Sequence, residues 1–375
     1  MDRILTTHVG SLPRPRALLD LMKGGVRGNV FDACAREAVA ECVRRQAECG
    51  IDILTDGEQS KTGFFSYVRE RLEGFEERPG LRSEKFQAEV SAFPEYYEQY
   101  FKEAMLGGAV VPAAPLVCTG PVRYRGEGAL LRDIENLKAA AAGCECHAVF
   151  MPCVAPSGVG SNEYYPSDEE FFHAVGRALG TEYRAIVDAG FLLQVDDPFL
   201  SENFGDPSLD AKQRAWRARI YVEALNESLR GIPPERVRLH TCYGINEGPR
   251  IHEASLAEVA GYMLKVNAGA YSFEAANPRH EHEYHLWETV KLPEGKALIP
   301  GVITHASNIV EHSELIAERI IRFAKLVGRE NVVAGADCGF SSQASYKTEV
   351  HPTVIWAKFE ALRDGARLAS ERLWA

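Results

Sequence analysis

The chain has 375 residues, of which 46% are hydrophobic and 25% are charged, as is typical of a globular protein with a large buried core. Its formal net charge of −11 argues against a nucleic-acid partner, because phosphate binding needs a basic surface. The sequence has no apolar run of about 18 residues for a membrane span and no signal-peptide pattern, so we expect a cytoplasmic protein.

Short apolar runs bounded by turns alternate with amphipathic helices along the whole chain. The runs are nearly continuous, which is typical of parallel strands that are buried on both faces. In chain order, the predicted strands occupy residues 4–12, 52–58, 114–120, 147–155, 190–198, 236–244, 270–277, 297–305 and 331–339. This alternation predicts an α/β fold, and we expect a (βα)₈ TIM barrel with one of the nine strands outside the barrel or at its rim.

Several predicted helices carry recognisable ends. Ser255 and Glu258 have the spacing of a capping box, and Gly269 is placed to end the helix that they begin. Ser313 is placed to cap a later helix that Gly328 would end. These signals set the expected boundaries of two of the outer helices.

Residues 75–112 depart from the strand–helix rhythm and predict a helical insertion that could cover the barrel mouth. No linker rich in Pro, Gly or Ser divides the chain, and no internal repeat is visible. We therefore expect residues 1–375 to form a single domain.

The nine cysteines are an odd number in a long chain without an export signal, which favours free thiols over disulfides. Cys34, Cys42 and Cys49 lie in a helical stretch and are expected to pack in the core. Cys144 and Cys146 form a CxC pattern, which we assign to the turn before a strand rather than to a metal site.

Polar or reactive residues follow the apolar half of most predicted strands, although core packing does not require them there. In a (βα)₈ barrel these strand ends meet on one face, where active sites lie. The residues concerned are His8, Ser11, Asp56, Glu58, Asp196, Asp197, His240, Cys242, Glu274, His305, Asp337 and Cys338. Each alone could be a cap or a turn former, but so many at equivalent strand ends indicate an active site.

His240 and Cys242 alternate on one predicted strand, so their side chains face the same space. Imidazole and thiolate are ligands that suit Zn²⁺, which needs one or two more. Glu274 ends the next strand, and Cys338 ends the last strand, which barrel closure brings near the first. The residues alone leave both a zinc site and a metal-free arrangement open.

The motifs of the strand ends resemble a known family in their order and composition. They read GSLP (10–13), DGE (56–58), QVDDP (194–198), HTC (240–242), FEAAN (273–277), ITHAS (303–307) and ADCG (336–339). This order resembles the catalytic barrel of cobalamin-independent methionine synthase, from about residue 5 to about residue 345. The full-length family enzyme has an additional N-terminal barrel, so the chain resembles the short, core-only members.

The resemblance implies a role for each matching residue. The implied zinc ligands are His240, Cys242, Glu274 and Cys338. Glu58 and Asp196 would bind the ammonium group of an amino-acid thiol, Ser11 would meet its carboxylate, and His305 would be the proton donor to the leaving group.

The reaction that these roles imply is zinc-dependent methyl transfer to a thiol, with homocysteine giving methionine as the leading case. A free thiol has a pKa near 8.5, and Zn²⁺ deprotonates it. Glu274 is the ligand expected to yield when the substrate thiol arrives. The expected partners are a small-molecule thiol and a methyl donor, either a methyl-tetrahydrofolate or another compound. The family's folate-site tryptophan has no counterpart, and Tyr164 and Tyr165 are either its substitutes or packing residues.

Two alternatives remain open. One is alkylation of another thiol, as in epoxyalkane:coenzyme M transferase, which would need a basic patch for the sulfonate. Arg14, Arg16 and Lys61 lie near the predicted mouth, although Arg14 and Arg16 are expected in surface loops. The other is a non-catalytic zinc protein, which a barrel of this size does not need for folding.

Three histidines, His280, His282 and His285, follow the Glu274 strand closely. They could suggest a second metal site, but no cysteine accompanies them and their spacing matches no metal motif. We expect a solvated loop or a contact with substrate there.

Overall fold

The computed structural model describes residues 2–80, 86–103, 108–244 and 247–375. Eight parallel strands form one sheet in the order β1-β11-β10-β9-β8-β7-β5-β2. Their bounds are β1 (Leu5–Thr6), β2 (Ile53–Leu54), β5 (Ala148–Val154), β7 (Leu192–Asp196), β8 (Val237–His240), β9 (Ala270–Phe273), β10 (Ala297–Ile303) and β11 (Val333–Ala336). The backbone N–H of Asp52 donates to the carbonyl of Thr6 at 3.2 Å, so the two edge strands approach each other and nearly close the barrel.

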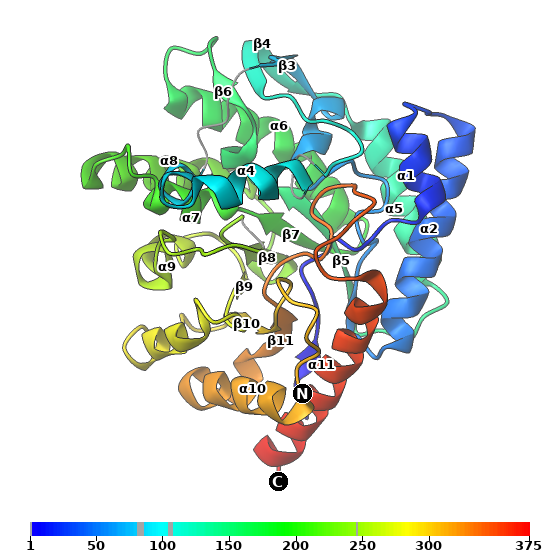
Figure 1. Cartoon of the computed structure of the whole chain (residues 1–375), viewed down its shortest axis with the longest axis vertical. Coiled ribbons are helices and arrows are strands. Elements are labelled where there is room, and N and C mark those ends of the chain that lie inside the picture. Colours follow the sequence, from blue (N-terminus) through cyan, green and yellow to red (C-terminus); the bar gives the residue numbers. More distant parts are fainter. Residues whose placement is uncertain (1, 81–85, 104–107, 245–246) are drawn as a thin grey trace.

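Helices surround this barrel on its outside (Figure 1). They are α1 (Arg16–Lys23), α2 (Asn29–Glu48), α5 (Glu127–Ala141), α6 (Asp168–Asp188), α7 (Pro198–Gly205), α8 (Ala211–Ser228), α9 (Leu256–Met263), α10 (Ser313–Val327) and α11 (Pro352–Leu373). Apolar residues of most of these helices join those of the strands in one buried cluster, as the alternation of strand and helix predicted, whereas those of α1 pack against α2 in a separate cluster. The TIM-barrel prediction is therefore confirmed.

The ninth predicted strand lies outside the barrel, as expected. It is β4 (Leu116–Tyr124), which pairs antiparallel with β3 (Leu72–Glu77) and parallel with β6 (Ser161–Asn162). The sequence did not indicate β3, because its residues LEGFEE are largely exposed and carry three glutamates. The two-residue β6 is too short to leave a periodic signal.

The insertion near residues 75–112 differs in part from the prediction. Residues 75–77 belong to β3, while α3 (Gln87–Ala92) and α4 (Pro94–Glu103) supply the helical part. Residues 81–85 and 104–107 lie outside the described part of the chain. Figure 1 shows α4, in cyan, on the β7 side of the barrel, between α7 and α8 on one side and α1 on the other.

The helix-end signals were partly right. Ser255 and Glu258 form the predicted capping box of α9, but the helix ends at Met263 rather than at Gly269. A side chain at Gly269 would meet the Pro234 carbonyl oxygen at 2.7 Å, so close packing explains this glycine. Gly328, with φ 92°, ends α10 as predicted, whereas His312 rather than Ser313 caps its start.

No helix within the described residues combines the length and the apolar character that crossing a membrane requires.

Candidate active site

The predicted site residues gather around one cavity of about 560 Å³ at the carboxyl ends of the strands. Six of the eight predicted residues line it, namely Ser11, Glu58, Asp196, His240, Cys242 and Cys338. Glu274 and His305 are not among the described residues that line the cavity, although both lie beside it in the same strand-end layer. The barrel topology therefore brings together residues that are far apart in sequence.

His240, Cys242 and Cys338 form a compact group that we call the His–Cys–Cys cluster. One potential ligand atom of each lies within 4.8 Å of the others, and the two Sγ atoms are 3.3 Å apart. β8 ends at His240 and β11 ends at Ala336, so both cysteines stand two residues beyond these strand ends. All three side chains are buried.

The imidazole of His240 has the features of a metal ligand. Its Nδ1 lies 3.1 Å from Oγ of Ser272, and its Nε2 has no hydrogen-bond partner among the described residues. Burial lowers the pKa of His240 to about 3, so the ring is neutral, which is the form that binds metals. A second ring nitrogen fixed by a hydrogen bond is typical of metal-ligating histidines.

A cation would also stabilise the ionised form of the neighbouring thiols of Cys242 and Cys338. The contact with Cys338 and burial raise the pKa of the Cys242 thiol well above its ordinary value. Without a positive partner this thiol therefore stays protonated at neutral pH. A divalent cation at the cluster would reverse this, because it stabilises both thiolates.

Glu274, the fourth predicted ligand, has other partners. Its Oε2 accepts from Nη2 of Arg250 at 2.7 Å and from Nδ2 of Asn277 at 2.8 Å. Its Oε1 accepts from the backbone N–H of Tyr243 at 3.2 Å. Three of the four predicted ligands thus converge, while the fourth is held next to them by an arginine that the sequence did not indicate.

His305 lies in a second buried group with Glu274 and Asp337, whose potential ligand atoms are also within 4.8 Å of one another. Burial lowers the pKa of His305 to about 3, so its ring is neutral in this environment. Asp337 accepts from the backbone N–H groups of Ala275 and Ala276 at 2.7 and 2.8 Å, which fixes the loop after β9. The role of His305 as proton donor stays a prediction.

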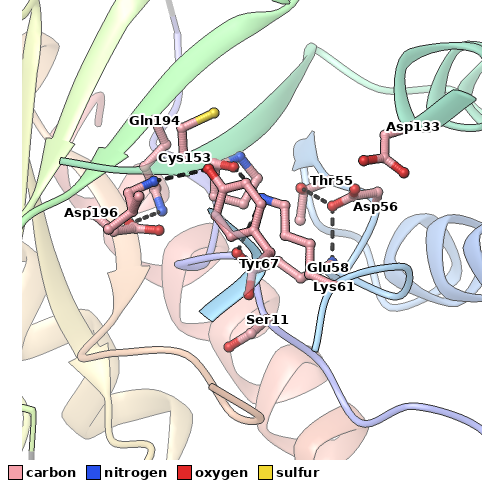
Figure 2. A network of polar contacts seen from close by, with 12 residues as sticks. Ser11, Thr55, Asp56, Glu58, Lys61, Tyr67, Asp133, Cys153, Gln194 and Asp196 are labelled. Atoms are coloured by element: carbon pink, nitrogen blue, oxygen red, sulfur yellow. Dashed lines mark hydrogen bonds and ion pairs between the residues drawn. The ribbon is translucent and has the colours of Figure 1, made fainter. Parts of the chain in front are cut away.

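Glu58 and Asp196, the predicted ammonium pair, line the cavity, and a buried lysine lies beside Glu58. Nζ of Lys61 lies 3.6 Å from Oε1 of Glu58 and donates to the Pro152 carbonyl at 2.5 Å. Burial and the charge of Glu58 raise the pKa of Asp196 well above its ordinary value. Figure 2 shows Lys61 beside Tyr67, between Asp196 on one side and Asp56 on the other. Lys61 therefore pairs with Glu58, whereas the carboxylate of Asp196 accepts from Nε2 of Gln194 at 2.7 Å.

Two of the three cations of the predicted basic patch are engaged within the protein. Arg14 is buried rather than in a surface loop, and its three nitrogens donate to the carbonyls of Lys61, Ser341 and Glu58. Lys61 is engaged by Glu58, and Arg16 is exposed as expected. The sequence could not show the position of Arg14, because its partners lie 44 to 327 residues away.

The rest of the cavity wall contains several aromatic side chains together with polar and charged ones. Phe64, Phe65, Phe86, Phe101, Phe199 and Phe340 line it. Phe86 directly precedes α3 and Phe101 belongs to α4, so the inserted segment contributes to the cavity. Tyr164 and Tyr165 are not among the described lining residues, and the hydroxyl of Tyr165 accepts from the backbone N–H of Val122. Tyr165 therefore packs beside the outer sheet, whereas Tyr164 is exposed.

The expectation of a solvated loop was wrong for His280. Its ring stacks on Tyr243 at 4.0 Å and lies between the carboxylates of Glu253 and Glu283. His285 is exposed and pairs with Glu288.

The nine cysteines are free, and Cys42 and Cys49 are buried while Cys34, Cys144 and Cys146 are half-buried.

Comparison with known proteins gives one family. The sequence profile of the cobalamin-independent synthase catalytic domain matches residues 163–356. The methionine synthase of Sulfolobus acidocaldarius is 25% identical over 339 residues, which cover 89% of this chain and 85% of that protein. The methionine synthase of Saccharolobus islandicus strain Y.N.15.51 is 25% identical over 380 residues, covering 98% and 95% of the two chains.

Two solved structures have the same fold. A B12-independent methionine synthase from Shewanella sp. W3-18-1, in complex with selenomethionine, superposes with a TM-score of 0.73 at 20% identity and covers 99% of both chains. A putative vitamin-B12 independent methionine synthase from Listeria monocytogenes has a TM-score of 0.67 at 19% identity, covering 100% of this chain and 99% of the other.

Proposed function

Because the chain belongs to the family of the cobalamin-independent synthase catalytic domain, we propose that it transfers a methyl group to the thiol of homocysteine and forms methionine. The observation that carries this proposal is the buried His–Cys–Cys cluster at the base of a cavity that Glu58 and Asp196 also line. A thiol-binding centre and an ammonium-binding pair thus share one space.

The cluster fits a zinc ion. Two thiols 3.3 Å apart and a neutral buried imidazole with an unpartnered Nε2, among the described residues, form a donor set of the kind that zinc prefers. His240, Cys242 and Cys338 would hold the ion, with Glu274 as the fourth, exchangeable ligand. When bound, zinc would supply the positive charge that keeps the acceptor thiol ionised at neutral pH.

The residues of the chain would orient the acceptor around that thiol. Glu58 and Asp196 would bind its ammonium group. The positive charge of Lys61 beside Glu58 reduces the repulsion between the two buried carboxylates. Ser11, which accepts from the backbone N–H of Ser341 at 3.4 Å, would meet its carboxylate. His305, which is neutral in the free protein, would have to gain a proton in the substrate complex before it delivers one to the leaving group of the donor. The aromatic wall would bind the methyl donor and exclude water.

Alkylation of coenzyme M is the alternative with less support. A sulfonate needs available cations, and two of the three cations predicted for it, Arg14 and Lys61, are engaged by carbonyl groups or by Glu58. A cytoplasmic location stays a prediction from the sequence.

The first experiment measures bound zinc and methionine formation in the wild type and in Cys242→Ser. We expect one zinc per wild-type chain and a large loss of both zinc and activity in the variant, because the cluster loses a thiolate ligand. Cys153→Ser, at a buried thiol outside the cavity lining, is the matched control and should retain zinc. Zinc-free wild-type protein with full activity would refute the proposal.

A further inference from the structure

The carboxylate of Glu274 is held by three donors next to the His–Cys–Cys cluster. Arg250 donates to it at 2.7 Å, Asn277 at 2.8 Å and the backbone N–H of Tyr243 at 3.2 Å. Tyr243 directly follows Cys242, so the carboxylate is fixed relative to the cluster through the backbone. Glu274 therefore has a complete set of partners without being a metal ligand.

Arg250 is itself fixed in a row of alternating charges. Its Nε donates to Oε1 of Glu253 at 2.6 Å, and the other oxygen of Glu253 lies 3.0 Å from Nε2 of His280. Nδ1 of His280 lies 2.8 Å from Glu283. Each of the five side chains in this row is at most 10% exposed. Arg250 also adopts a φ of 54°, a conformation that a non-glycine residue keeps only where its surroundings fix it.

The charges at the cluster explain why such a partner is needed. Two cysteine thiolates already balance a divalent cation, and the acceptor thiolate of the proposed reaction adds a further negative charge. A carboxylate that leaves the cation at that moment would be a buried charge without a partner, which is strongly unfavourable. The guanidinium of Arg250 is already in hydrogen-bond contact with that carboxylate.

We propose that Arg250 is a positioning residue that takes up the Glu274 carboxylate when the acceptor thiolate binds. Glu274 then exchanges between the metal and Arg250, and the acceptor's S–H proton leaves to water. This inference rests on the proposed function, because it requires a metal at the cluster and a thiol acceptor. It adds to that function the residue that makes the exchange of the fourth ligand favourable.

Zinc-edge X-ray absorption tests this exchange without turnover. The zinc-loaded wild type, Arg250→Met and Arg250→Lys are titrated with homocysteine in the absence of a methyl donor, and the number of sulfur ligands is measured. We expect the wild type to go from two sulfurs to three with loss of an oxygen ligand. In Arg250→Met the homocysteine concentration at the midpoint should rise at least about tenfold, and the oxygen ligand should be retained. The reason is that the variant loses a charge-assisted hydrogen bond to Glu274, and such bonds are stronger than neutral ones. Arg250→Lys should fall between them, since it keeps the charge but not the fork that bridges Glu253 and Glu274.

Arg319→Met is the matched control, because Arg319 is also buried and pairs with a carboxylate, that of Glu281, away from the cavity lining. It should leave the midpoint at the wild-type value even if it lowers stability. A third sulfur entering Arg250→Met at the wild-type midpoint would overturn the inference, as would a lower unfolding temperature without a change in midpoint. If Arg250→Met does not fold, an unchanged midpoint in Arg250→Lys overturns it. A wild type that binds no zinc, or gains no sulfur, would instead contradict the proposed function.

Discussion

Single buried polar residues at the strand ends have two different roles. Some face the cavity, as Glu58 and Asp196 do. Others hold the backbone, as His8 does, whose Nε2 lies 2.8 Å from Oε1 of Gln46 and whose Nδ1 accepts from the N–H of Gly10. Both kinds look alike in the sequence, because the partner that distinguishes them is remote. Gln46, for example, lies on α2, 38 residues from His8.

His8 should make the protein sensitive to acid. Burial lowers its pKa to about 4, although the hydrogen bond with Gln46 acts in the opposite direction. Because the folded pKa is below the unfolded value of about 6.5, the stabilisation is present above pH 6.5 and is lost as the pH falls toward 4. Between pH 7 and pH 4, His8→Gln should therefore lose about 3 kcal/mol less unfolding free energy than the wild type.

Urea unfolding of metal-free protein at pH 7, 5.5 and 4 measures this difference. His285→Gln is the control, because His285 is exposed and its removal should leave the pH dependence nearly unchanged. Parallel pH curves for the wild type and His8→Gln would show that His8 does not carry the effect.

At the scale of elements, the inserted helices are attached to the loops of the barrel mouth. On α4, Tyr97 donates to Glu89 at 3.0 Å, and Tyr100 donates to Glu349 at 2.7 Å. Glu89 in turn accepts from the backbone N–H of His252 at 2.6 Å. With Phe101 of α4 in the cavity wall, these contacts support the expectation that the segment covers the mouth.

The two helix starts that the sequence marked with serine should respond differently to mutation. Ser255→Ala removes the capping box of α9 and should lower the unfolding free energy by about 1 kcal/mol. Ser313→Ala should change it by less than about 0.5 kcal/mol, because His312 caps α10 instead. Equilibrium unfolding in urea compares the two variants, and an equal loss in both would mean that Ser313 also acts as a cap.

At the scale of the whole molecule, the barrel does not depend on the metal for its core. One large cluster of buried apolar side chains joins the strands to the surrounding helices. Chelation should therefore abolish activity and lower the unfolding temperature by several degrees, since a ligand of the folded state stabilises it. The far-UV circular dichroism spectrum and a single cooperative transition should remain, as we propose for a chain that forms one domain. Loss of the spectrum on chelation would instead indicate a structural metal.

The sequence alone determined the barrel and most of its site. Alternation of buried strands and amphipathic helices is a local signal, and it placed all eight barrel strands and the strand outside the barrel. Residues two apart on a strand, such as His240 and Cys242, face one side by the geometry of the strand itself. Parallel strand ends meet at one rim, so Cys338 could be expected beside them from its position after the last strand.

Only the tertiary structure decided how the buried charges are partnered. Arg250 engages Glu274, which lies 24 residues further along the chain. Arg14, expected at the surface, instead joins three segments through their carbonyl groups. A buried charge pairs with whichever group the fold brings within about 3 Å, and that choice depends on loops packed across the barrel mouth rather than on any local pattern.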